Sequence, residues 1–147
     1  MNYENYIETF DDLVKSFPEL FEKLTGSDRL NFSTLTKSTI ERVFNKKDPI
    51  HGIYLISNKS DNPLYVGRSR NMAVRIGVDH RAIQKAQANL TYKIAKEKNI
   101  TPVEARSFMY ENFFVRMIEI DNEYARTLFE VYVAMKLQTP YNSFRES

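Results

Sequence analysis

The stretch G-I-Y-L-I-S-N-K-S-D-N-P-L-Y-V-G, residues 52–67, decides the fold of this chain. Its two ends are rich in β-branched and aromatic side chains, and the polar residues between them favour a turn. The stretch therefore predicts a β-hairpin. Alternate residues of a strand share one face, so an antiparallel pairing can place Tyr54 and Tyr65 on the same patch. Taken singly, each tyrosine is more simply explained by ordinary packing in a strand.

The residues after the hairpin predict further helices and one more strand. Asn71 is suited to cap a short helix that ends near Gly77, and the Ala-, Gln- and Lys-rich residues 81–98 have high helix propensity. T-P-V-E, residues 101–104, has the pattern of a capping box with proline at the first helical position, and it predicts a helix to about residue 110. The run FFVRMIEI, residues 113–120, predicts the third strand, and a last helix is expected from 123 to 137.

The first fifty residues are predicted to be helical. Apolar side chains recur every three or four residues from Tyr6 to Phe17, Pro18 breaks or restarts the helix, and another helix is expected over about 35–44. The turn-rich N-K-K-D-P, residues 45–49, marks a boundary. We therefore expect an N-terminal helical arm over 1–49 and a main α/β (α+β) domain over 50–147.

Composition excludes several classes of protein. The 147 residues are 42% hydrophobic and 27% charged, which suits a soluble domain with its own core. Cysteine is absent and histidine occurs twice, so disulfide scaffolds, thiolate zinc sites and His-rich metal sites are excluded. No apolar run is long enough to span a membrane, and the acidic, polar start does not resemble a signal peptide. We expect a cytoplasmic protein that does not bind membranes.

Charge is unevenly distributed along the chain. The formal net charge is only +2, but residues 68–98 carry many more basic than acidic side chains. Such a segment can track the phosphates of a nucleic acid, or it can be the solvated face of a helix. The basic residues are Arg68, Arg70, Arg75, Arg81, Lys85, Lys93, Lys96 and Lys98.

Arg75 and His80, which follow the hairpin in the sequence, have side chains suited to phosphate chemistry. Arg75 lies ten residues after Tyr65, and its guanidinium can donate two hydrogen bonds to a phosphate and stabilise charge in a transition state. His80 can transfer protons at neutral pH. Each residue alone is also explained as an ordinary surface side chain.

Glu130 is the one charged residue between Arg126 and Lys136 in the apolar helix predicted over 123–137. It can pair with Arg126 on the helix surface, although Arg preceding Glu is the less favourable order for such a pair. Alternatively, its carboxylate can hold a hard divalent cation that bridges to a phosphate. Asn142 either makes a loop turn after Pro140 or reaches back over the same site.

These residues together resemble the GIY-YIG nuclease superfamily. The resemblance lies in G-I-Y at 52–54, Y-V-G at 65–67, Arg75, a late-helix glutamate and P-Y-N at 140–142, and it covers about residues 50–144. It implies a small three-stranded antiparallel sheet flanked by helices. Many members also have a histidine four residues after the arginine, but that position is Asp79 here and His80 follows it.

The resemblance also implies a role for each of these residues. Tyr54 corresponds to the tyrosine thought to activate water, Tyr65 to its companion, Arg75 to the phosphate-stabilising arginine and Glu130 to the single ligand of a Mg²⁺ or Mn²⁺ ion. Asn142 takes a supporting role, and His80 takes the histidine role if a small change of register allows it. The DNA contacts expected around this site are made by Gly67, Arg68, Arg70, Arg81 and Lys85.

The leading hypothesis is a metal-dependent DNA endonuclease that hydrolyses phosphodiester bonds with an activated water. A restriction-like or phage-borne enzyme without further domains is expected, because the sequence has no zinc-finger or helix-turn-helix signature. The alternative is a noncatalytic nucleic-acid- or protein-binding module with the same fold. The apolar stripes of residues 1–25 must be buried, either against the main domain or against a second subunit, and we favour a homodimer that forms through this arm.

Overall fold

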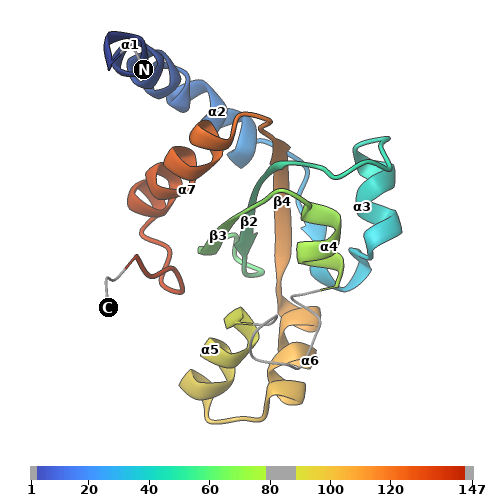
Figure 1. The fold of residues 1–147 in the computed structure, drawn as a ribbon. Coiled ribbons are helices and arrows are strands. Elements are labelled where there is room, and N and C mark those ends of the chain that lie inside the picture. Colours follow the sequence, from blue (N-terminus) through green and yellow to red (C-terminus); the bar gives the residue numbers. More distant parts are fainter. Residues whose placement is uncertain (1–2, 79–88, 145–147) are drawn as a thin grey trace.

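The computed structural model describes residues 3–78 and 89–144 (Figure 1). Its centre is an antiparallel sheet of four strands in the order β1-β4-β2-β3. The strands are β1 (Leu30–Asn31), β2 (Gly52–Ser57), β3 (Pro63–Ser69) and β4 (Phe114–Glu119).

The sequence-based prediction of three strands is therefore wrong by one strand. The additional strand, β1, lies in the segment predicted to be helical, and it pairs with Phe114 and Val115 of β4. A two-residue strand is too short to show a periodic pattern of apolar residues, which explains why the sequence did not reveal it. The 3₁₀ helix η1 (Phe32–Thr34) follows directly.

The predicted hairpin is confirmed. In β2 and β3, Tyr54 lies opposite Gly67 and Ile56 lies opposite Tyr65, with an irregularity in the pairing between Ile56 and Ser57. Residues opposite one another share a face of the sheet, and so do alternate residues of one strand. The two tyrosines are consequently diagonal neighbours on one face.

Helices precede and follow the hairpin in the sequence, at positions close to those predicted. The capping box at Thr101 and Glu104 is present, and the side chains of Thr36, Asn71 and Asn122 also cap helices. The helices are α1 (Tyr3–Lys15), α2 (Phe17–Thr25), α3 (Lys37–Val43), α4 (Met72–Gly77), α5 (Asn89–Lys98), α6 (Pro102–Asn112) and α7 (Glu123–Leu137). No helix within the described ranges is both long and apolar enough to cross a membrane.

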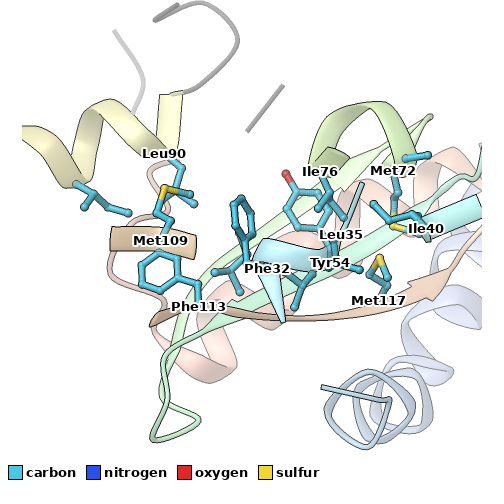
Figure 2. Close-up of a cluster of buried hydrophobic side chains, with 14 of the residues drawn as sticks. Phe32, Leu35, Ile40, Tyr54, Met72, Ile76, Leu90, Met109, Phe113 and Met117 are labelled. Atoms are coloured by element: carbon cyan, nitrogen blue, oxygen red, sulfur yellow. The ribbon is translucent and has the colours of Figure 1, made fainter. Parts of the chain in front are cut away.

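The two faces of the sheet have separate hydrophobic clusters. Tyr54 and Ile56 of β2 belong to a cluster that includes residues of η1, α3, α4, α5 and α6, whereas Ile53 and Leu55 belong to a cluster with α2 and α7. Figure 1 accordingly shows α7 on one side of the sheet and α3 and α4 on the other. Figure 2 shows Tyr54 within the first cluster, among Phe32, Leu35 and Ile76.

The segment before residue 50 contributes to both clusters. Phe17 of α2 is buried, and its ring lies 5.3 Å from the ring centroids of Phe129 and Tyr132 on α7. The apolar stripe of α2 is thus covered by the chain's own α7, while Phe10 of α1 remains about half exposed. The domain boundary at residue 50 and the homodimer both stay predictions.

Candidate active site

The hairpin and α4 bring Tyr54, Tyr65 and Arg75 into contact. The rings of Tyr54 and Tyr65 have centroids 6.2 Å apart and are tilted by 44°. The phenol of Tyr54 is hydrogen-bonded to both Tyr65 and the Arg75 guanidinium, and Arg75 is also hydrogen-bonded to Tyr65. The prediction that the two phenols share one patch is therefore confirmed, and Arg75 is hydrogen-bonded to both.

Two glycines allow this close approach. A Cβ at Gly67 would lie 2.7 Å from Cε1 of Tyr54 and closer still to its Cζ and hydroxyl oxygen, so the Tyr54 ring lies directly on the backbone of β3. A Cβ at Gly52 would lie 2.6 Å from Cε of Met72, the first residue of α4. Carbon atoms in contact are normally about 3.5–4.0 Å apart, so both positions have no room for a larger residue.

The position of Arg75 follows from how α4 begins. The Asn71 side chain accepts a hydrogen bond from Val74 N (3.3 Å) and caps the helix, while Met72 N donates to Ile50 O just before β2 (2.9 Å). These bonds fix the first turn of α4 to the start of the hairpin. Arg75, one residue beyond this capped turn, is thereby directed over the two tyrosines.

Burial sets the protonation state of the cluster. Tyr54 is completely buried, and this burial, together with the neighbouring Tyr65, raises its pKa well above the usual 10.0 although Arg75 acts in the opposite direction. Partial burial lowers the pKa of Arg75, but its contacts with Tyr54 and Tyr65 more than compensate, so the pKa is raised overall. At neutral pH the cluster therefore holds a neutral Tyr54 phenol against a guanidinium cation.

Glu130 lies on α7 and reaches the same hairpin from the opposite face of the sheet. Its carboxylate accepts a hydrogen bond from Nη1 of Arg68 at 3.1 Å, and its side chain is only 12% exposed. Burial raises the pKa of Glu130 above the usual 4.5, and Arg68 partly opposes this effect. The pairing with Arg126 considered from the sequence does not form, because the Arg126 guanidinium donates to the carbonyls of Ile120 and Asp121.

Asn142 holds the free edge of β3. Its Oδ1 accepts from Val66 N (2.8 Å) and from Thr139 Oγ1 (2.6 Å), and its Nδ2 donates to Val66 O (2.7 Å). The side-chain amide thus takes the place of a neighbouring strand at the residue between Tyr65 and Gly67. A further bond from Tyr141 N to Leu64 O (3.1 Å) extends this pairing.

The same C-terminal turn is tied to the basic helix α5. Lys93 Nζ donates to Tyr141 O at 2.9 Å, and the Tyr141 hydroxyl donates to Glu97 at 3.0 Å. Burial, and secondly Glu97, raise the pKa of Tyr141 to about 12. Helix α5 is therefore fixed beside the edge strand that carries Tyr65.

The predicted site residues thus lie around one strand. Tyr65 and Gly67 point to the α4 face of β3, Arg68 points to the α7 face, and Arg70 follows the end of the strand. Three predicted residues, His80, Arg81 and Lys85, lie outside the described residues.

Sequence reasoning missed Arg126 and Thr139. Arg126 is 95% buried, and it was considered only as a surface partner of Glu130. The signal that could have singled it out is its place, four residues before Glu130, on an otherwise apolar helix. Thr139 is buried and orients Asn142, but nothing in its sequence context distinguishes it from an ordinary loop threonine.

The charge and exposure of Glu130 fit a role as a ligand for a hard cation. Carboxylate oxygens are preferred by Mg²⁺ and Mn²⁺, and Mg²⁺ sites commonly use only one or two protein carboxylates. Arg68 is the one partner of this carboxylate among the described residues, and its guanidinium is about half exposed, so it can give way to another cation. In the same parts of the chain, no three His, Cys, Asp or Glu side chains form a cluster that could hold a metal ion by themselves.

Comparison with known proteins gives one family assignment. The family model described as the GIY-YIG catalytic domain matches residues 50–142, which include every element of the site described above. Neither the curated proteins nor the solved structures searched give a match. The matched residues make up more than half of the chain and contain the hairpin, the arginine, the glutamate and the asparagine, and by this match the chain belongs to the GIY-YIG family, whose members are generally endonucleases.

Proposed function

We propose that this protein is a divalent-metal-dependent endonuclease that hydrolyses phosphodiester bonds in DNA. The observation that carries the proposal is the Arg75 guanidinium, held against Tyr54 and Tyr65 on one face of the hairpin, with the largely buried Glu130 on the other face. In this proposal the guanidinium and the carboxylate, on the two faces of one edge strand, act on the same phosphodiester.

Arg75 is assigned to the transition state. Phosphodiester hydrolysis concentrates negative charge on the non-bridging oxygens, and a guanidinium already fixed in position stabilises this charge without reorganising. The hydrogen bonds that Arg75 donates to Tyr54 and Tyr65 supply this fixation. Arg75 is therefore proposed to bind the phosphate more tightly as the reaction proceeds.

The two tyrosines are assigned different parts. A phenol must be deprotonated to act as a base, and the raised pKa of the fully buried Tyr54 keeps it protonated at neutral pH. We assign to Tyr54 the orientation of Tyr65 and Arg75. The contact with the attacking water, which the family resemblance gives to Tyr54, we assign to Tyr65, because Tyr65 is only partly buried.

Glu130 is assigned to hold the divalent cation. A bound cation would neutralise the phosphate and stabilise the leaving oxygen. The ion pair with Arg68 keeps the Glu130 carboxylate charged and oriented until the cation binds. DNA is proposed as the substrate because Arg68 and Arg70 lie at the end of β3, and the basic helix α5 is tied through Lys93 to Tyr141, which pairs with the same strand.

The proposal is tested by plasmid nicking with Mg²⁺ or Mn²⁺ and with EDTA, using wild type, Glu130→Gln and Glu119→Gln. Glu119 is a matched control, since it is also partly buried and paired with a cation, Lys46 at 3.2 Å, but it lies in β4, opposite Gly52, and no role in the reaction is assigned to it. We expect metal-dependent nicking by the wild type and by Glu119→Gln. Glu130→Gln should fold and bind DNA but should not cut, because the amide keeps the shape and loses the charge.

The outcomes separate the assignments. Undiminished metal-dependent cutting by Glu130→Gln would show that Glu130 is not the ligand. Cutting by the wild type in EDTA would refute metal dependence. A wild-type protein that binds DNA but cuts no plasmid with either metal would support a noncatalytic module instead.

A further inference from the structure

A cavity lies where β3 ends against the first turns of α7. It has a volume of about 330 Å³ and is lined by Arg68, Ser69, Arg70, Glu123, Arg126 and Thr127. The cavity is on the α7 side of the sheet, so it is separate from the Tyr54–Arg75 cluster on the α4 side. None of the roles assigned above uses Ser69, Thr127 or Arg126.

Arg126 is the unusual residue of this cavity. Its side chain is 95% buried, yet only Nη1 is bonded, to the carbonyls of Ile120 (2.9 Å) and Asp121 (2.7 Å). The N–H groups on Nη2 and Nε have no partner among the described residues, and neither nitrogen is sealed from solvent. A buried cation is normally fully paired. The unbonded part of this guanidinium therefore faces the cavity as a fixed donor.

The other lining residues add donors around the same space. Arg70 is exposed and makes no ion pair or hydrogen bond with any described residue. The hydroxyl of Ser69 accepts from Asn71 N (2.8 Å), so its own proton remains to be donated. Glu123 is the one carboxylate among the lining residues, Glu130 is paired with Arg68, and three arginines line the cavity.

We propose that this cavity binds a non-scissile phosphate of the DNA backbone through Arg126, Arg70 and Ser69, next to the Glu130–Arg68 pair. This inference rests on the proposed DNA substrate. Guanidinium groups match phosphate oxygens with two parallel hydrogen bonds, and a donor that is already buried and fixed loses little entropy on binding. Because Arg126 and Glu130 are four residues apart on α7, a phosphate in the cavity positions the neighbouring stretch of the strand beside Glu130.

The test measures binding of duplex DNA in EDTA, where cleavage does not interfere, over a series of salt concentrations. Arg70→Ala should weaken binding about tenfold or more and lower the slope of log affinity against log salt by about 0.9, the value for one lost phosphate contact. Glu123→Gln should tighten binding, because a repelling carboxylate is removed. Arg42→Ala, an exposed arginine of α3, is the matched control and should leave the affinity unchanged.

A substitution of Arg126 can also disturb the turn that it holds, so Arg126→Lys is used together with a thermal unfolding measurement. Arg126→Lys should weaken DNA binding even at a temperature where thermal unfolding shows it to be fully folded, since an ammonium lacks the planar pair of donors. Inorganic phosphate is titrated alone in parallel. Binding of phosphate as tight as that of DNA would indicate a site for free phosphate and overturn the assignment to DNA.

The failure of this inference is distinct from failure of the proposed function. If Arg70→Ala and Glu123→Gln both bind DNA as the wild type does, with the same salt slope, the cavity is not a phosphate site, while metal-dependent nicking still stands. If the wild type neither binds nor cuts DNA, both proposals fall.

Discussion

The contact between Gly67 and the Tyr54 ring leads to a specific prediction for Gly67→Ala. The added Cβ would lie 2.7 Å from Cε1 of Tyr54 and closer to its Cζ and hydroxyl oxygen. Ordinary carbon contacts are about 3.5–4.0 Å, so the ring must move by about 1 Å. Tyr54 is completely buried and is hydrogen-bonded to Tyr65 and Arg75, so such a shift breaks these hydrogen bonds.

The expected cost follows from these contacts. Overpacking of a buried site typically costs about 1–3 kcal/mol, which lowers the unfolding temperature of a domain of this size by about 2–4 °C per kcal/mol. The cleavage rate should fall about a hundredfold, because the guanidinium of Arg75 loses its fixed position. The loss of activity should therefore persist at temperatures where the variant is fully folded.

The assay combines thermal unfolding by circular dichroism with plasmid nicking at a temperature well below the transition. Gly26→Ala is the matched control. Gly26 ends α2 with φ −94°, and a Cβ there would approach the Glu22 carbonyl oxygen at 3.0 Å, far from the site. It should change stability by less than about 1 kcal/mol and leave nicking intact. Wild-type stability and nicking in Gly67→Ala would refute the tight contact and the role given to it.

Three further predictions concern other contacts. Asn142→Ala should lower the free energy of unfolding, measured in urea, by about 1–3 kcal/mol, because Val66 loses the partners of both its N–H and its carbonyl. An unchanged midpoint of urea unfolding would show that Asn142 does not hold the edge of β3. Binding of Mn²⁺ without DNA, followed by calorimetry, should weaken as pH falls through a value above 4.5, since burial raises the pKa of Glu130 and the proton competes with the metal; affinity independent of pH in that range would argue against Glu130. Phe17→Ala should cost about 3–5 kcal/mol in the same urea experiment, because its ring packs on Phe129 of α7; a cost below about 1 kcal/mol would show that α2 does not pack there.

The elements with strong local signals could be predicted from the sequence. The hairpin has strands rich in β-branched and aromatic residues around a polar turn, and the helices that begin after Thr101 and Asn122 have clear capping residues; the structure confirms all three. By contrast, β1 could not be predicted, because two residues carry no periodicity and their partner, Phe114, is more than eighty residues away.

The candidate site was only partly visible in the sequence for a related reason. Spacing placed the two tyrosines on one face, since alternation in a strand is a local rule. The partner of Glu130 was not accessible, because Arg68 is 62 residues away and meets it only when α7 packs against β3. The same holds for Asn142, whose bonds to Val66 span 76 residues.

The cluster around Arg75 is proposed to be the site at which the protein cleaves phosphodiester bonds. This proposal is tested most directly by the single-turnover nicking rate of Arg75→Ala with protein in excess over plasmid DNA and Mg²⁺ present, beside Arg42→Ala as a control on α3. We expect Arg75→Ala to cut at least about a hundredfold more slowly while its DNA affinity stays near that of the wild type, and Arg42→Ala to cut at the wild-type rate. Equal rates for the two variants, or a change in Arg75→Ala confined to DNA affinity, would contradict the proposal.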